Sequence, residues 1–123
     1  MANTHNAGFL ALVTDAKSRV AEIDLEQYKT LAAAGEPHIL IDVREESEFA
    51  AGHVRGALHL GKGVIERDIE TKVPDKSAKL VLYCGGGFRS ALVADNLRKM
   101  GYIQPISLDG GWRVLKDSGL PLE

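Results

Sequence analysis

Two continuous runs of apolar residues stand out along the chain, at residues 38–43 and 79–83. Neither run alternates with polar positions, and each has the length of one strand, which is typical of strands buried on both faces of a parallel sheet. Shorter apolar segments predict three more strands, at residues 20–23, 56–60 and 105–108. The apolar pattern therefore predicts five strands.

Between these runs the apolar positions recur every three or four residues, which is the period of an amphipathic helix. Asp24 and Gln27 have the spacing of a capping box, so one helix is expected to begin after Asp24 and to end at Gly35. Further helices are predicted at residues 8–19, 45–51, 64–72 and 89–100, with a last turn or two at 112–116. Strands that alternate with helices predict an α/β fold, with a parallel sheet covered by helices on both faces.

Residues 1–19 are expected to form a helical extension packed on one domain that spans residues 20–123. Four apolar positions of this extension share one helical face: Phe9, Leu12, Val13 and Ala16. The apolar stretch has no basic residue before it, and it is far shorter than the ~18–20 apolar residues that span a membrane. We therefore expect a cytoplasmic protein that does not bind membranes.

The composition narrows the choice of partners and cofactors. The 123 residues carry a formal net charge of -2, and charges of both signs are scattered, so no basic surface for nucleic acid is expected. Cys84 is the single cysteine, which excludes an internal disulfide and a cysteine-based metal site and fits a reducing compartment. The four histidines lack the spacing of metal ligands. We predict neither a metal nor a cofactor.

The segment with the strongest chemical signal is CGGGFRS at residues 84–90, between a predicted strand and a predicted helix. Ligands of open parallel sheets bind beyond the carboxyl ends of the strands, and Cys84 occupies such an end. The glycines permit backbone conformations in which successive N–H groups converge on an anion, the start of the helix adds unpaired donors, and Arg89 adds a permanent cation. The predicted catalytic residue is Cys84, and the predicted substrate-binding residues are Gly85, Gly86, Gly87, Phe88, Arg89 and Ser90.

These features also favour an ionised thiolate at Cys84 at neutral pH, without a histidine base beside it. A single cysteine is usually an inert buried thiol, and a glycine-rich turn alone more often indicates phosphate or nucleotide binding. The conjunction of Cys at a strand end, three Gly, and then Arg and Ser at a helix start favours a functional anion site.

Three motifs, in this order along the chain, resemble those of the rhodanese family. They are the upstream signature with Asp42-Val43-Arg44, Glu48-Phe49, Gly52-His53-Val54 and Gly56-Ala57, the loop at 84–90, and Asp109-Gly110-Gly111-Trp112. Together they cover roughly residues 20–120. The resemblance implies a rhodanese-like α/β domain with a central, mostly parallel sheet of five strands.

The resemblance also implies a reaction, sulfur transfer through a persulfide. The Cys84 thiolate would attack the outer sulfur of thiosulfate or a similar donor, and the loop amides would hold the resulting persulfide. The sulfur would then pass to cyanide or to a small or protein thiol, which must be external because the chain has no second cysteine. Arg89 would bind the anionic donor.

Residues outside the loop carry weaker signals. Asp42 stands at a strand end and is expected to brace the loop. Lys62 and Glu66 are candidates for the rim of the pocket, with a solvated loop lysine as the alternative for Lys62. Arg44 and Glu48 have the spacing of a local ion pair.

Three other functions stay open. A persulfide carrier needs the same thiolate as an enzyme, and a non-catalytic docking module of this fold often lacks the cysteine that this chain retains. The related dual-specificity phosphatases have a loop one residue longer than the six positions from Cys84 to Arg89, and they usually have His where Tyr83 precedes the cysteine. The physiological donor and acceptor and the oligomeric state are not predicted.

Overall fold

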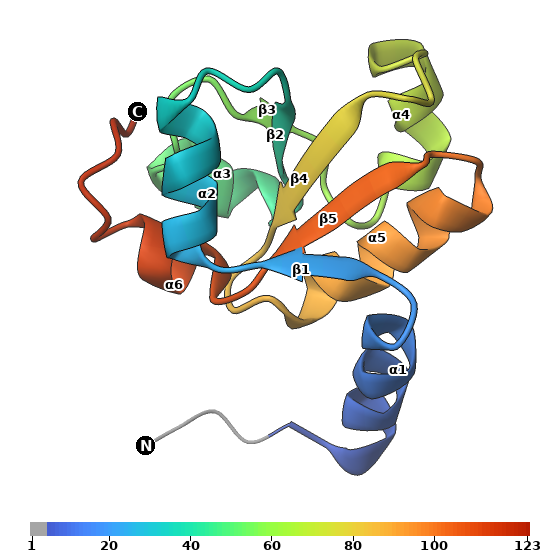
Figure 1. Ribbon diagram of the computed structural model, residues 1–123. Coiled ribbons are helices and arrows are strands. Elements are labelled where there is room, and N and C mark those ends of the chain that lie inside the picture. The colour runs from blue at the N-terminus through green and yellow to red at the C-terminus, as the bar shows by residue number, and fades with distance from the viewer. Residues whose placement is uncertain (1–4) are drawn as a thin grey trace.

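A five-stranded parallel sheet forms the centre of the computed structural model, which describes residues 5–123 (Figure 1). In spatial order its strands are β1 (Ala21–Ile23), β5 (Gln104–Leu108), β4 (Lys79–Tyr83), β2 (Ile39–Asp42) and β3 (Leu58–His59). All four neighbouring pairs are parallel, so the α/β prediction is confirmed, and the sheet is wholly rather than mostly parallel.

Within the described residues the chain forms six helices: α1 (Ala7–Lys17), α2 (Leu25–Ala33), α3 (Glu46–Ala51), α4 (Ile65–Lys72), α5 (Phe88–Lys99) and α6 (Gly111–Leu115). Helices α4 and α5 bury apolar side chains on one face of the sheet, and α2 and α6 do so on the other (Figure 1). The capping box predicted at the start of α2 is present, with reciprocal hydrogen bonds of 2.8 Å between Asp24 and Gln27.

The position of β4 at the centre of the sheet explains why its sequence is apolar at successive positions. Leu80 and Leu82 are buried against one helical layer, whereas Val81 and Tyr83 are buried against the other. Successive side chains of a strand point to opposite faces, so a strand covered on both sides has no solvent-facing positions. Cys84 follows directly and places the candidate nucleophile at the carboxyl end of the sheet.

The strand predicted at residues 56–60 is shorter in the structure, where β3 has two residues. Gly56 has a φ of +86°, which belongs to a turn rather than to a strand. Val54, just before this turn, forms an isolated antiparallel bridge with Leu122 near the end of the chain. Because of this turn, the strand begins at Leu58 and not at Gly56.

Helix α1 packs on α5 at the outside of the domain (Figure 1). Val13 and Ala16 are buried, but Leu12, which the sequence places on the same helical face, is 61% exposed. A helix that packs mainly on one other helix buries only a narrow stripe, and Leu12 falls at its margin. Residues 1–4 of the expected N-terminal extension lie outside the described residues.

Candidate active site

The sulfur atom of Cys84 faces the glycine turn. Cys84 Sγ accepts a hydrogen bond from the Gly87 N–H at 3.1 Å and a longer one from the Ser90 N–H at 3.4 Å. Gly87 has a φ of +99°, a left-handed conformation that directs its N–H at the sulfur and that glycine adopts without strain. Helix α5 begins at the next residue, so its free donors and dipole also point to the sulfur.

Two buried hydroxyl groups extend this environment. Ser90 Oγ lies 3.5 Å from Cys84 Sγ, and it shares a 2.8 Å hydrogen bond with Ser107 Oγ on β5. Ser107 was not predicted from the sequence, because it belongs to the site only through the pairing of β4 with β5, where Leu82 stands beside Ser107. Two N–H groups therefore donate to one sulfur atom, and its thiol lies within hydrogen-bond distance of the Ser90 hydroxyl, to which it donates.

Helix α6 fixes the outer side of the loop. The Trp112 N–H donates to the carbonyl oxygen of Cys84 at 2.7 Å, and the Arg113 N–H donates to that of Gly85 at 3.1 Å. A Cβ atom at Gly111 would collide with the Cys84 carbonyl oxygen, so only glycine fits this approach. Since these two carbonyl groups are bound by α6, they do not compete for the loop N–H groups that face the sulfur.

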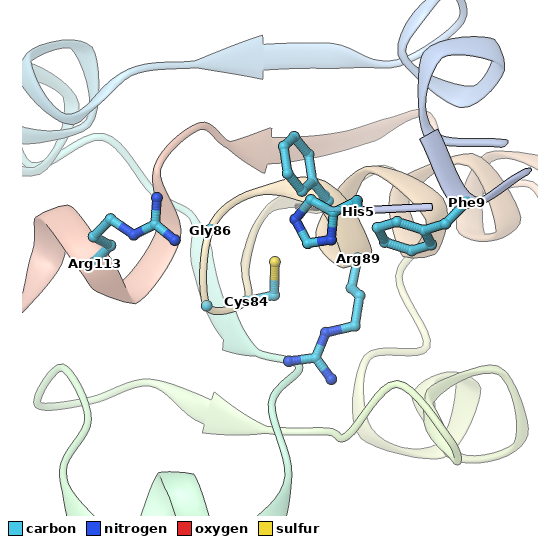
Figure 2. Close-up of a pocket in the computed structure, with 8 residues that line it drawn as sticks. His5, Phe9, Cys84, Gly86, Arg89 and Arg113 are labelled. Carbon is cyan, nitrogen blue, oxygen red and sulfur yellow. The ribbon is translucent and has the colours of Figure 1, made fainter. Parts of the chain in front are cut away.

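A pocket of about 530 Å³ opens above the loop, and Cys84 lies at its floor with 1% of its surface exposed. Figure 2 shows Arg89 and Arg113 on opposite sides of Cys84. Two cations beside one sulfur favour an anionic ligand. The remaining lining residues are His5, Phe9, Gly85, Gly86 and Phe88.

Three of these lining residues, His5, Phe9 and Arg113, were not predicted from the sequence. His5 and Phe9 come from the segment that opens α1, far from the loop in the chain, so no local pattern marks them. Arg113 directly follows the Gly-Gly-Trp element, and this adjacency was the one available signal. The predicted loop residues Gly85, Gly86, Phe88 and Arg89 do line the pocket.

Asp42 is not among the residues that line the pocket, and only a series of contacts through Arg44 and Trp112 connects it with the loop. Its buried carboxylate accepts hydrogen bonds from Arg44, including one from Nη2 at 2.7 Å. The Arg44 guanidinium lies 4.5 Å from the centre of the Trp112 ring, and the backbone of Trp112 holds the Cys84 carbonyl. The predicted pair of Arg44 with Glu48 is not formed, since Glu48 instead accepts from the Glu45 N–H and caps α3.

The two residues suggested for the pocket rim lie elsewhere. Lys62 is exposed in the loop before α4, where its N–H binds the Val43 carbonyl oxygen at 2.9 Å. Glu66 accepts a 2.9 Å hydrogen bond from Asn96 on the outer surface of α5. Neither side chain lines the 530 Å³ pocket. The loop lysine is therefore found in the solvated position that was the alternative.

Residues 5–123 contain no cluster of three or more His, Cys, Asp or Glu side chains that could bind a metal ion. Within the same residues, none of the helices has the length and apolar character needed to cross a membrane.

Known proteins share this fold and this sequence pattern. A sulfurtransferase of Allochromatium vinosum is 33% identical over 103 residues, covering 84% of this chain and 94% of that protein. The thiosulfate sulfurtransferase PspE of Escherichia coli is 33% identical over 66% of this chain and 74% of its own length. Among solved structures, a protein of unknown function from Rhodopseudomonas palustris, described as a possible tyrosine phosphatase, superposes with a TM-score of 0.84 at 27% identity, covering 100% of this chain and 99% of that one.

The match to a protein-family model covers most of the chain. The model of the rhodanese-like domain matches residues 24–118, which include every strand except β1 together with the loop at Cys84. The chain belongs to the rhodanese-like domain family.

Proposed function

We propose that the protein is a sulfurtransferase that moves a sulfane sulfur from thiosulfate or a similar donor to cyanide or a thiol, through a persulfide on Cys84. The observation that carries the proposal is the position of Cys84 Sγ, which faces the N–H groups of Gly87 and Ser90 at the floor of a pocket. The relatives named as sulfurtransferases support the same assignment.

In the first step the Cys84 thiolate attacks the outer sulfur of the donor. A new S–S bond forms at Cys84, the S–S bond of thiosulfate breaks, and sulfite leaves with the electron pair. Arg89 and Arg113 line the pocket and offset the negative charge of the donor and of the departing sulfite.

Ser90 and Ser107 stabilise the thiolate between turnovers. When Cys84 is ionised, the Ser90 hydroxyl donates to the sulfur, and it accepts from the Ser107 hydroxyl at 2.8 Å. A hydroxyl that accepts one hydrogen bond is a stronger donor for the next, so the pair acts together.

In the second step an external nucleophile attacks the outer sulfur of the persulfide. The bond between the two sulfur atoms breaks, the acceptor takes the outer one, and Cys84 regains its thiolate. Because the chain has a single cysteine, no internal thiol can release the sulfur as a disulfide.

Intact mass spectrometry after incubation with thiosulfate tests the proposal. The wild-type protein should gain the mass of one sulfur atom and lose it with a reductant, whereas Cys84→Ser should gain nothing. Serine is close to cysteine in size, so circular dichroism should show an unchanged fold for this variant. Absence of sulfur addition to the wild-type protein at saturating donor would contradict the proposal.

The same sample distinguishes the alternatives. Thiocyanate release on addition of cyanide supports a turnover enzyme, and a stable persulfide with slow release supports a carrier. Hydrolysis of p-nitrophenyl phosphate without persulfide formation would instead assign the site to a phosphatase, as the description of the Rhodopseudomonas palustris protein suggests for that protein.

A further inference from the structure

Three aromatic rings from two distant segments meet at the pocket. The His5 ring packs edge-on against Phe88 with 4.7 Å between centroids, and it lies 5.2 Å from Phe9. Phe9 and Phe88 are 6.3 Å apart, also edge to face. These distances are those of favourable aromatic contacts, so the rings form one continuous aromatic wall, which is apolar at Phe9 and Phe88 and carries the polar imidazole of His5.

The wall lies directly beside the reactive sulfur. All three aromatic residues line the pocket that has Cys84 at its floor. In Figure 2, His5 and Phe9 border the pocket on one side of Cys84, and Arg113 stands on the other side. A ligand at the sulfur therefore meets cations on some sides and an apolar surface on another.

Helix α1 holds this wall in place. Lys17 Nζ lies 5.2 Å from the centre of the Phe88 ring. Arg19, just after the helix, donates to Asp95 on α5 from Nε at 3.0 Å and from Nη2 at 2.8 Å. Both attachments join α1 to α5, the helix that also begins at the active-site loop.

The pocket is larger and more apolar than thiosulfate requires. Its volume of about 530 Å³ falls in the range of roughly 300–1,000 Å³ that is typical of sites for small organic molecules. Thiosulfate is a small divalent anion with no apolar part, so it leaves the aromatic wall without a partner.

We infer that Phe9 and His5 select organic sulfur donors, in which the sulfane sulfur sits at an anionic end and the body is an apolar group about the size of a ring. The inference rests on the proposed function, because it names the donor class for the same cysteine. The anionic end meets Arg89 and Arg113, and the apolar body contacts Phe9, His5 and Phe88.

Organic thiosulfonates have this chemistry and serve as probes. The Cys84 thiolate attacks the terminal sulfur of the thiosulfonate, and a new S–S bond forms at Cys84. The sulfur–sulfur bond of the donor breaks, and the sulfinate leaves with the electron pair. Benzenethiosulfonate and methanethiosulfonate carry the same charge and the same reacting bond, and they differ in the phenyl or methyl group that the wall would contact.

The test is the ratio of kcat/KM for benzenethiosulfonate to kcat/KM for methanethiosulfonate, with cyanide as acceptor. The wild-type protein should prefer the phenyl donor. Phe9→Ala should lower the ratio about fivefold, the loss expected for one aromatic contact. Leu12→Ala is the matched control, because Leu12 lies on the same helix but is 61% exposed and outside the pocket, and it should leave the ratio unchanged.

Phe9→Leu separates loss of the ring from loss of the helix. It keeps an apolar side chain at the contact with α5, so α1 should stay attached, and its ratio should fall between those of the wild type and Phe9→Ala. An equal ratio in the wild type and both Phe9 variants would overturn the inference while leaving the proposed function intact. If neither donor adds sulfur to Cys84, the proposed function itself fails.

Discussion

Gly111 shows how a single residue shapes the loop that carries the cysteine. The backbone of α6 approaches the Cys84 carbonyl so closely that a Cβ atom has no room, and Gly111 has a φ of +50°. The hydrogen bond from the Trp112 N–H to this carbonyl depends on the close approach. The glycine is therefore required both by its conformation and by its neighbour.

We predict that Gly111→Ala lowers the free energy of unfolding by about 1–3 kcal/mol and slows persulfide formation in the folded fraction, because the loop must move. Urea unfolding and the rate of sulfur addition measure the two effects. Gly63→Ala is the control, since a Cβ atom at this position would meet no other atom within 4 Å and the φ of Gly63 is not in the left-handed region. Equal effects at both positions would contradict this explanation.

Ser107 tests the contribution of the hydroxyl pair. We predict that Ser107→Ala slows alkylation of Cys84 by iodoacetamide at neutral pH by about three- to tenfold, the effect of one lost hydrogen bond. The reason is that Ser90 loses the donor that strengthens its own bond to the sulfur. Ser47→Ala, at an exposed position on α3, should not change the rate. An unchanged rate in Ser107→Ala would remove the hydroxyl pair from the mechanism.

At the scale of elements, the contact between α1 and α5 depends on one buried carboxylate. Asp95 has 6% of its side chain exposed and pairs with Arg19, while Arg98 and Lys99 lie within 3.5 Å. The hydrogen bonds from Arg19 hold the pKa of Asp95 well below its usual range. Arg19 also pairs with Asp15, but that carboxylate is 65% exposed.

We predict that Asp95→Ala lowers the free energy of unfolding by about 1–2 kcal/mol, because it removes charged hydrogen bonds from Arg19 and Arg98, whose own side chains are partly exposed to solvent. Amide hydrogen exchange in α1 should become faster, while the strands keep their protection. Asp15→Ala is the control with a smaller effect on both measurements, since solvent screens its pair with Arg19. Uniformly faster exchange over the whole chain would show instead that α1 is part of the main cooperative unit.

The same pair predicts a dependence on pH. Because the pKa of Asp95 is lower in the folded protein than in the unfolded chain, where it is about 3.9, its contribution is complete above about pH 5 and is lost as the pH falls further. Arg19 keeps its charge in this range, because its hydrogen bonds to Asp95 and Asp15 raise its pKa. The protection factors of α1, which are exchange rates corrected for the intrinsic effect of pH on amide exchange, should fall below about pH 5 in the wild type and fall much less in Asp95→Asn.

Local sequence patterns predicted most of the elements and the central part of the site. Strand β4 was predicted at its observed bounds because burial on both faces makes every position apolar, and the loop was predicted because its glycines, cysteine and arginine are contiguous. His5, Phe9 and Ser107 were missed because they reach the site through packing between distant segments. The spacing of Arg44 and Glu48 along the chain led to a wrong prediction of an ion pair, since Arg44 pairs with the buried Asp42.

At the scale of the whole molecule, the pair of Asp42 and Arg44 links several layers. Asp42 ends β2, and Arg44 donates at 2.7 Å to the carbonyl oxygen of Gly52 after α3 and stacks on Trp112 of α6. Both charged side chains are buried, with 0% and 3% exposure. Because neither side chain is solvated, the negative charge of Asp42 and the positive charge of Arg44 stabilise each other.

We predict that Arg44→Met lowers the free energy of unfolding by about 3–5 kcal/mol, because it leaves the Asp42 carboxylate buried without its cation. Replacing both residues, as Asp42→Asn with Arg44→Met, should restore part of this loss. Urea denaturation of the two single variants and the double variant gives the coupling free energy. Additive losses would mean that the two side chains stabilise the fold independently.

Helix α1 is attached to the domain through α5. As a result, the residues proposed to select the donor and the residues that react with it lie in different parts of the chain. Cys84, its loop and the two pocket arginines lie within the stretch from the end of β4 to α6. His5 and Phe9 precede β1. Side chains at the start of α1 can therefore be exchanged without altering sheet register or the N–H groups that donate to the sulfur. Random mutagenesis of that short stretch can therefore change which sulfur donors react, while Cys84 and its loop keep their sequence.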